Sequence, residues 1–241
     1  NKDDDDDYGN ENDDDCSCNS VNFQAKTSRF CVEVNLNMMM IIMVIMISYR
    51  KTETCKKYKR NDDDLCKEAI YGLPEINKEA ITKGRLIACP GCYPTSALIP
   101  LVPYLSQGII ENEGIVIDSK SGTSGGGREP NQKLLLSECG EGLSAYGLIN
   151  HRHTSEIEQV ASLISGNKIE LLFTPHLVPI SRGMHSTIYG RLRDPGLTSD
   201  DCRILLDNYY RNFKNIKVLP VDTYPSTKWV RNTNQIFLSV K

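Results

Sequence analysis

The stretch IACPGCYPTSALIP, residues 87 to 100, sets Cys92 between a Pro-Gly pair and an apolar run that predicts a helix. Gly91 permits a tight backbone angle, and Pro94 suits the first helical turn. A helix N-terminus lowers the pKa of a thiol, because its dipole and unpaired N–H groups favour the thiolate. Cys92 is therefore a candidate nucleophile. The alternative, for Cys92 as for Cys89, is a small buried apolar residue, which is the commoner fate of a free cysteine.

Around this stretch the chain reads as ordinary globular sequence from about residue 69 onward. Turn and capping signals predict a short helix within 71–84, a helix over 94–105 broken at Pro100 or Pro103, and a helix over 197–213 capped by Thr198 or Ser199. β-rich segments predict strands within 85–89, 114–122, 169–180, 186–192, 216–220 and 235–240. The mixture predicts an α+β fold in which an antiparallel-rich sheet carries helices.

The composition narrows the class of partner. Residues 1–20 carry a charge of −8, so the remaining 221 residues carry +5 within the total of −3. A mildly basic body suits a small anionic ligand, and nothing in it resembles the dense basic stripe of a nucleic-acid binder. The nine cysteines are odd in number and irregularly spaced, which favours a reducing compartment over a disulfide framework.

Residues 1–68 differ from the rest in composition. The acidic run NKDDDDDYGNENDDDCSCNS has almost no apolar content, which predicts disorder. The run MMMIIMVIMI, residues 38–47, is too short to cross a bilayer and predicts a buried strand or short helix. We assign 1–68 to a disordered, acidic and low-complexity segment of uncertain origin, and 69–241 to a catalytic, substrate-binding domain. The acidic start does not resemble a secretory or transit signal.

The motif HRH, residues 151–153, precedes a helical apolar pattern for which Ser155 and Glu158 form a capping-box signature. In an extended segment His151 and His153 would point the same way, and either could exchange protons near neutral pH. Zinc is a rival interpretation, with His176 or His185 completing the ligand set, but acidic ligands are missing nearby. A solvated pair at a loop end is the third alternative.

The segment SKSGTSGGGREP, residues 119–130, is a glycine-rich loop that follows a buried strand. Its N–H groups could line an anion or cofactor site, although a flexible surface loop explains the glycines nearly as well. A nucleophile, a base and oxyanion donors are together the minimum for acyl transfer through a thioester. The three motifs therefore favour this chemistry more strongly in combination than any one of them does alone.

These motifs resemble those of the N-acetyl-γ-glutamyl-phosphate reductases, in their plant-like form. The resemblance is carried by six blocks in family order, which cover roughly residues 70–240: YGLPEI, IACPGCYPTSALIPLVP, VIDSKSGTSGGGR, YGLINHRHTSEIEQ, FTPHLVPISRGMHSTIYG and VRNTNQIFLSV. It implies the fold of the aspartate-semialdehyde dehydrogenases, which is like that of glyceraldehyde-3-phosphate dehydrogenase, with a dinucleotide-binding domain before the catalytic and dimerisation domain. It also implies a homo-oligomer without membrane or nucleic-acid partners.

The resemblance implies reduction of N-acetylglutamyl 5-phosphate to the 5-semialdehyde by NADPH. Cys92 would attack the acyl phosphate and expel phosphate, and hydride transfer to the thioester would then lead to the aldehyde. A histidine of the HRH motif would handle the proton; His153 is our first choice because it abuts the predicted helix, and His151 is the alternative. The compartment stays open between plastid, mitochondrion and cytoplasm.

The resemblance also implies residues that bind the two reactants. Arg182, Arg152 and Arg128 are candidates for the carboxylate and phosphate of the substrate, since a guanidinium matches either anion, and Arg182 is our first choice. Near the thioester and the nicotinamide we expect Ser121, Gly122, Ser124 and Gly125, whose backbone donors would stabilise the oxyanion. Asn234 matches an asparagine of the closing motif.

The chain departs from the family pattern in several places. Cys89 replaces an asparagine, Ser155 a proline and Asn232 a glycine. The dinucleotide fingerprint, a strand followed by a glycine-rich turn and a helix, is missing from residues 1–69, and the expected C-terminal helix is also missing. An inactive fragment that serves as a dimerisation or interaction module is therefore the alternative function.

Overall fold

The computed structural model describes residues 29–36, 63–127 and 129–241. The described chain is built on one mixed seven-stranded sheet in the order β5-β6-β4-β7-β1-β9-β8. The strands are β1 (Arg29–Leu36), β4 (Ile115–Ser121), β5 (Ser144–Ala145), β6 (Leu171–Leu177), β7 (Met184–Arg191), β8 (Ile216–Val218) and β9 (Ile236–Val240). Within this sheet, β4 with β6 and β8 with β9 pair in parallel, and the other neighbouring strands pair antiparallel. The predicted α+β, antiparallel-rich sheet is confirmed.

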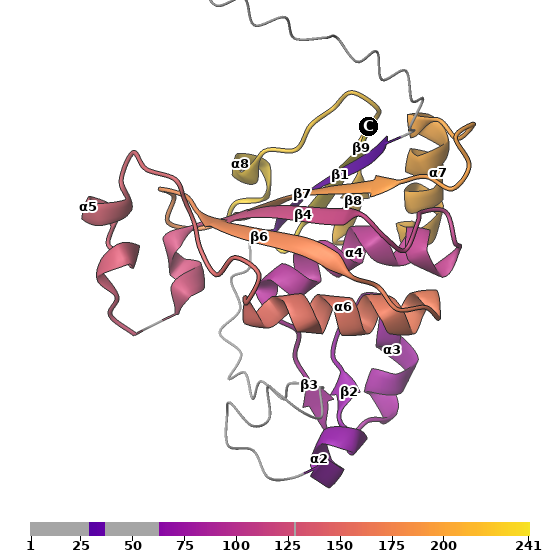
Figure 1. Cartoon of the computed structure of the whole chain (residues 1–241), viewed down its shortest axis with the longest axis horizontal. Coiled ribbons are helices and arrows are strands. Elements are labelled where there is room, and N and C mark those ends of the chain that lie inside the picture. The colour runs from indigo at the N-terminus through magenta and orange to yellow at the C-terminus, as the bar shows by residue number, and fades with distance from the viewer. Residues whose placement is uncertain (1–28, 37–62, 128) are drawn as a thin grey trace, which may run out of the picture.

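Two helices, α4 (Cys92–Ser106) and α6 (Arg152–Ser165), lie side by side against one face of the sheet, as Figure 1 shows. Helix α7 (Ser199–Tyr210) packs beside α4 and contacts β8 and β9. The fully buried side chains of the core come from these helices and from the strands beneath them, and include Leu98, Tyr104, Ile117, Phe173 and Tyr210. The sheet is thus covered on this face by a thick apolar layer.

Helix α4 is apolar on all sides, and its residues from Tyr93 to Leu105 are all buried. It runs without a break through Pro100 and Pro103, so the predicted break is wrong. A proline at position i removes the hydrogen bond to the carbonyl of residue i−4. For Pro103 that carbonyl belongs to Ile99, and the hydroxyl of Tyr210 donates to it instead. A tertiary contact thus replaces the missing helical hydrogen bond.

Three buried hydroxyls connect α4 to the sheet. The Ser96 and Ser186 hydroxyl oxygens lie 2.9 Å apart, and those of Ser186 and Ser119 lie 2.7 Å apart. Because side chains alternate along a strand, Ser121 points to the same side as Ser119, whereas Lys120 points to the opposite side. The first turn of α4 therefore lies next to the end of β4 and the loop that follows it.

A separate small unit precedes α4 in the chain and lies at the bottom of Figure 1. It contains α2 (Asp63–Glu68), α3 (Pro74–Lys83) and a parallel pair of strands, β2 (Ile70–Tyr71) and β3 (Ile87–Ala88). The predicted helix within 71–84 is confirmed, and the strand within 85–89 covers two residues. Residues Cys89 to Gly91 then join β3 to α4.

Two stretches of the segment 1–68 have regular structure: 29–36 forms β1, between β7 and β9, and 63–68 forms α2. In these stretches the structure differs from the expected disorder, because strand pairing on both edges of β1 supplies order that composition does not reveal. The acidic run and the run at 38–47 lie outside the described residues. None of the described helices is long and apolar enough to span a membrane.

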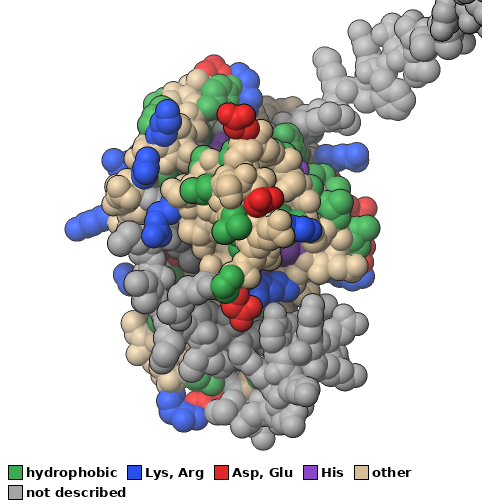
Figure 2. Space-filling model, turned by 90° about the vertical axis from the view of Figure 1, so that its left-hand side faces the viewer, with side chains coloured by type: hydrophobic (Ala, Val, Ile, Leu, Met, Phe, Trp, Pro, Cys, Tyr) green, Lys and Arg blue, Asp and Glu red, His purple; other side chains and the backbone are tan. Residues whose placement is uncertain are grey.

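The segment between β4 and α6 extends beyond the sheet, at the left of Figure 1. It contains η1 (Thr123–Gly126), η2 (Gln132–Leu134), α5 (Leu136–Cys139) and β5. Several apolar side chains in it are exposed: Leu135, Leu136, Leu143, Leu148 and Ile149. Figure 2 shows hydrophobic side chains scattered among polar ones on the face that is at the left of Figure 1. The remaining helix, α8 (Thr227–Val230), leads through Asn232 to β9. Asn232 has φ 62°, a left-handed angle that asparagine tolerates better than most residues, which accounts for its replacing a glycine.

Candidate active site

The thiol of Cys92 belongs to the first residue of α4, after Gly91 as the N-cap. The backbone N–H groups of Cys92 and Tyr93 donate toward the sulfur and lower the pKa of the thiol, as does nearby Arg152. Burial raises the pKa more strongly, and the Glu156 carboxylate adds to the increase, so the net shift is upward. The expected lowered pKa is therefore wrong for the protein without a ligand, because the cost of desolvating the thiolate exceeds the helix-end effect.

The HRH motif lies at the start of α6, beside the Cys92 loop. His151 is the N-cap of α6, and its Nδ1 accepts a hydrogen bond from the His153 backbone N–H at 3.2 Å. The predicted Ser155–Glu158 capping box is wrong, because the helix begins at Arg152 and Ser155 lies inside its first turn. The two imidazole rings are 4.9 Å apart by their centroids although the motif is not extended.

Both imidazoles are neutral at pH 7. Burial, with the charge of Arg152, lowers the pKa of His151 to about 4. Burial, with the neighbouring His151 and Arg152, lowers the pKa of His153 to about 3. The rings pack against Tyr93 with centroid distances of 5.7 Å for His151 and 5.9 Å for His153. This packing fixes the rings next to the thiol-bearing turn.

His153 is 4% exposed, and both of its ring nitrogens are buried without a hydrogen-bond partner among the described residues. Its ring lies against Gly91: a Cβ placed on Gly91 would come 2.5 Å from Nε2. Such unsatisfied buried nitrogens are rare and call for a functional explanation. They leave both ring positions open to a group that enters the site with a substrate.

Glu156 is a site residue that the sequence prediction missed. It lies one turn after His153 on α6, and its Oε1 accepts from the Gly91 N–H at 3.0 Å and from the Tyr71 hydroxyl at 2.9 Å. Burial raises the pKa of this carboxyl. The three-residue spacing from His153 was the available signal, since residues i and i+3 share a helix face.

Ser121 is buried at the end of β4, where its hydroxyl donates to the Gly122 carbonyl at 3.1 Å and also bonds to the Tyr93 hydroxyl. The Tyr93 hydroxyl lies 2.8 Å from that of Tyr146. Ser121 is thus connected to the residue that follows Cys92. The Tyr93 ring, against which both histidine rings pack, links Ser121 to the HRH motif.

The glycine-rich loop does not offer the expected donors. The N–H groups of Gly122, Ser124 and Gly125 donate to the carbonyls of Gly183, Ser181 and Gly122. The first two bonds hold the loop against residues 180–183, on the connection from β6 to β7, and the third closes a turn within the loop, so these N–H groups are not available to an oxyanion. The Cys92 and Tyr93 N–H groups at the start of α4 are the donors that face the sulfur.

The arginine candidates lie in different places. Arg152 is exposed at the first turn of α6 and acts electrostatically on Cys92 and both histidines. Arg182 is exposed next to the loop, since its backbone nitrogen lies 3.0 Å from a Cβ built on Gly122. Arg128 lies outside the described residues.

Asn234 is exposed in the turn before β9. One row of paired residues crosses the sheet at the ends of four strands: Ser121, Met184, Leu36 and Ile236. Asn234, two residues before Ile236, therefore lies at the same end of the strands as Ser121. It is separated from Ser121 by strands β7 and β1. The structure therefore places it along the edge on which the loop lies, without a contact to that loop among the hydrogen bonds of the described residues.

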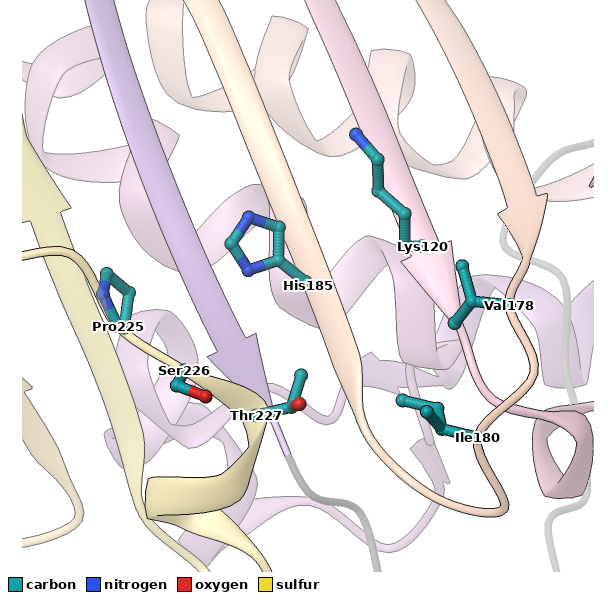
Figure 3. Close-up of a pocket in the computed structure, with 7 residues that line it drawn as sticks. All are labelled: Lys120, Val178, Ile180, His185, Pro225, Ser226 and Thr227. Carbon is teal, nitrogen blue, oxygen red and sulfur yellow. The ribbon is translucent and has the colours of Figure 1, made fainter. Parts of the chain in front are cut away.

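The other two histidines lie on the opposite face of the sheet. His176 and His185 flank Lys120 in register, and the ammonium of Lys120 lies 2.6 Å from the Asp118 carboxylate. Figure 3 shows Lys120 and His185 with Pro225, Ser226 and Thr227, which all line a cavity of about 330 Å³. The described residues contain no cluster of three or more potential metal ligands, so the four histidines are not assembled as the zinc hypothesis requires.

The described fold is a sheet covered by a helix that carries a thiol at its first residue. Comparison with known proteins identifies the class of protein to which this fold belongs. Residues 92–241 match the family model described as semialdehyde dehydrogenase, dimerisation domain, and the chain belongs to this family. The chain is similar to a solved aspartate semialdehyde dehydrogenase from Francisella tularensis, with a TM-score of 0.55 and 13% sequence identity. The match covers 72% of this chain and 61% of the dehydrogenase chain. A second one, from Vibrio cholerae, has a TM-score of 0.50, 16% identity, and coverage of 69% and 55%. These likenesses support the fold.

Among named relatives, the N-acetyl-gamma-glutamyl-phosphate reductase of Prochlorococcus marinus strain AS9601 is 98% identical over 184 residues, which are 76% of this chain and 52% of that protein. The protein of the same name from strain MIT 9211 is 60% identical over 185 residues, 77% of this chain and 52% of the relative. The chain thus spans about half the length of the curated relatives it matches.

Proposed function

We propose that the chain is the thiol-bearing part of an N-acetyl-γ-glutamyl-phosphate reductase of arginine biosynthesis. The substrate would be N-acetylglutamyl 5-phosphate and the product N-acetylglutamate 5-semialdehyde. The 98% identity to a protein of that name supports the substrate. The observation that carries the chemistry is the position of Cys92 at the start of α4, where two helix N–H groups donate toward its sulfur and the His153 ring lies against the preceding residue, Gly91.

The first step is acyl transfer to the thiol. The Cys92 sulfur forms a bond to the acyl carbon, the bond from that carbon to the phosphate oxygen breaks, and its electron pair leaves with phosphate. The Cys92 and Tyr93 N–H groups stabilise negative charge at the reacting centre, because they are fixed by the helix and need no reorientation.

The thiol proton has to leave for this step, because burial favours the protonated form. His153 is the acceptor we favour, since both of its ring nitrogens are unpartnered, and His151 is the alternative. An anionic acyl phosphate beside the rings would raise the pKa of both histidines by its opposite charge. The substrate would thereby strengthen the base that removes the proton. The same imidazolium returns a proton when the aldehyde leaves.

Binding of the substrate anions is assigned to Arg182 and Arg152, with Arg128 as a third candidate. Arg152 already acts on the charge of the thiol site, and Arg182 lies beside the loop at Gly122. Ser121, which bonds to the Tyr93 hydroxyl, contributes a hydroxyl at the acyl end. Each of these assignments predicts that replacing the residue lowers the affinity for the substrate.

The reductant we propose is NADPH, which supplies hydride to the thioester. The loop with Gly122, Ser124 and Gly125 would lie against the nicotinamide end, and Asn234 further along the same edge. Among the described residues no strand, glycine-rich turn and helix follow one another as a dinucleotide fingerprint requires. These residues thus fit only one end of the cofactor, and the remainder would need to be bound elsewhere.

A homo-oligomer is also proposed, because the matched family is a dimerisation domain. The alternative function is an inactive module that only associates with other chains, for which the match to a dimerisation domain is the support. We leave the compartment open between reducing environments.

The test is a half-reaction that needs no reductant. The purified chain is mixed with freshly prepared N-acetylglutamyl 5-phosphate, and released phosphate and acylated peptides are measured. We expect phosphate release together with an acyl group on Cys92. A folded chain that remains unacylated would contradict the enzyme function and favour the association module. Adding NADPH then shows whether the thioester is reduced by this chain.

A further inference from the structure

Glu156 connects three parts of the chain that meet at the thiol. It projects from α6, accepts the Gly91 N–H directly before Cys92, and accepts the hydroxyl of Tyr71 on β2. Tyr71 itself pairs in register with Ala88 of β3, four residues before Cys92. The carboxylate thus fixes both ends of the connection from β3 to α4.

Gly91 is held from two sides by one face of α6. The His153 ring occupies the space in which a side chain on Gly91 would lie, and Glu156 binds its N–H. Thr95 of α4 binds the Gly91 carbonyl, but Gly91, as the N-cap, has no side chain to cap the helix, so its N–H is held by a group outside α4. A hydrogen bond to a charged acceptor is among the stronger ones available.

The charge of Glu156 acts on the thiol as well. A carboxylate close to a sulfur disfavours the thiolate, and Glu156 contributes to the raised pKa of Cys92. The group that holds the thiol in place is therefore also one that opposes its ionisation. A neutral acceptor of the same shape would hold Gly91 without this second effect.

We propose that Glu156 is a positioning residue, whose carboxylate fixes the Cys92 turn through the Gly91 N–H and whose negative charge also acts on the thiol. This inference deepens the proposed function, because it concerns the same thiol. It assigns no proton transfer to Glu156. Tyr71 is the group that orients the carboxylate.

The experiment measures the rate of iodoacetamide alkylation of Cys92 against pH in the whole chain, by peptide mapping. Glu156→Gln keeps an acceptor for Gly91 and removes the charge, so the midpoint of the alkylation profile should move to lower pH. A shift of one unit would increase the thiolate fraction about tenfold below both midpoints. Glu158→Gln makes the same chemical change two residues away on α6, and its midpoint should equal that of the unmodified chain.

Two further variants separate positioning from charge. Glu156→Ala removes charge and acceptor, so it should lower the midpoint and also slow acylation by the acyl phosphate relative to Glu156→Gln. Tyr71→Phe keeps the carboxylate but removes one of its donors, and should give an intermediate loss of acylation. If the Glu156→Gln midpoint equals that of Glu158→Gln, or if Glu156→Ala and Glu156→Gln acylate equally fast, the inference is overturned.

The alkylation profile does not depend on the reductase activity. A shifted midpoint in a chain that never reacts with acyl phosphate would support the charge effect of Glu156 while contradicting the proposed function. Normal acylation with an unshifted midpoint would support the proposed function and contradict the charge effect of Glu156.

Discussion

The Tyr210 hydroxyl donates a hydrogen bond to the Ile99 carbonyl, which Pro103 leaves without its helical donor. Tyr210→Phe should therefore lower the free energy of unfolding by about 1–3 kcal/mol, the usual cost of a buried unpaired carbonyl. Urea denaturation measures this cost. The control Tyr209→Phe removes a hydroxyl from the neighbouring residue of α7 and should change stability by less than about 0.5 kcal/mol. Equal losses in both variants would contradict this account of the unbroken helix.

Stability should decrease as the pH falls below about 6.5. The folded-state pKa values of His151 and His153, about 4 and about 3, lie below the ordinary 6.5, so the unfolded chain binds protons first on acidification. Stability is thus complete above 6.5 and is lost as the pH falls toward the folded values. Each histidine contributes a slope approaching roughly 1.4 kcal/mol per pH unit.

The same pH range includes an opposing contribution from two carboxyls, since burial raises the pKa of Glu75 and Glu156. A folded-state pKa above the unfolded one makes a carboxyl bind protons in the native state and adds stability on acidification. The informative comparison is therefore between the unmodified chain and His153→Asn. Between about pH 7 and about pH 5, the urea midpoint of His153→Asn should vary less than that of the unmodified chain. Identical pH dependence in both proteins would show that His153 titrates normally.

Gly91→Ala should disrupt the site, because its Cβ would meet the His153 ring at 2.5 Å. We expect a stability loss of about 1–3 kcal/mol from overpacking and slower acylation of Cys92. Gly142→Ala is the control, since the nearest atom to a Cβ there is 3.6 Å away. Gly91→Ala should unfold at a lower temperature and acylate more slowly than Gly142→Ala. A fully active Gly91→Ala protein would mean that His153 does not restrain the turn.

Cys92→Ser should abolish acylation, whereas Cys89→Ser should retain most of it. Only Cys92 has the α4 N–H groups directed at its sulfur, and Cys89 lies before the helix. Mass spectrometry after exposure to the acyl phosphate distinguishes the two thiols. The reverse pattern would assign the nucleophile to Cys89.

Arg182→Ala should weaken substrate binding with a smaller effect on the maximal rate, because Arg182 lies beside the loop and not at the sulfur. The substrate concentration at half-maximal phosphate release is the readout. Arg211→Ala removes an exposed arginine from the end of α7 and should leave this substrate concentration unchanged. An unaltered value for Arg182→Ala would remove this residue from the substrate site.

Local sequence patterns predicted most of the elements. The strand predicted within 114–122 agrees with β4, and of the two caps predicted for the helix over 197–213, Thr198 is confirmed with its Asp201 partner. These features depend on residues close in sequence, so a short window contains their cause.

The errors share a different cause, which is long-range contact. The unbroken α4 depends on Tyr210, which is 111 residues from Ile99, and the Glu156 contact to Gly91 spans 65 residues. The N–H groups of Gly122 and Ser124 looked available because their acceptors, the carbonyls of Gly183 and Ser181, are distant in the sequence. No local pattern contains such contacts.

Helix α4 has further significance for how the protein can be assayed. Its fifteen residues span about 22 Å at 1.5 Å per residue, and all but the first and last are buried. The reactive sulfur is consequently attached to the interior of the molecule and not to a surface loop. Labelling of Cys92 can therefore serve as a reporter of core integrity: a substitution at the distant end that loosens the helix should be visible in the labelling rate before the protein unfolds.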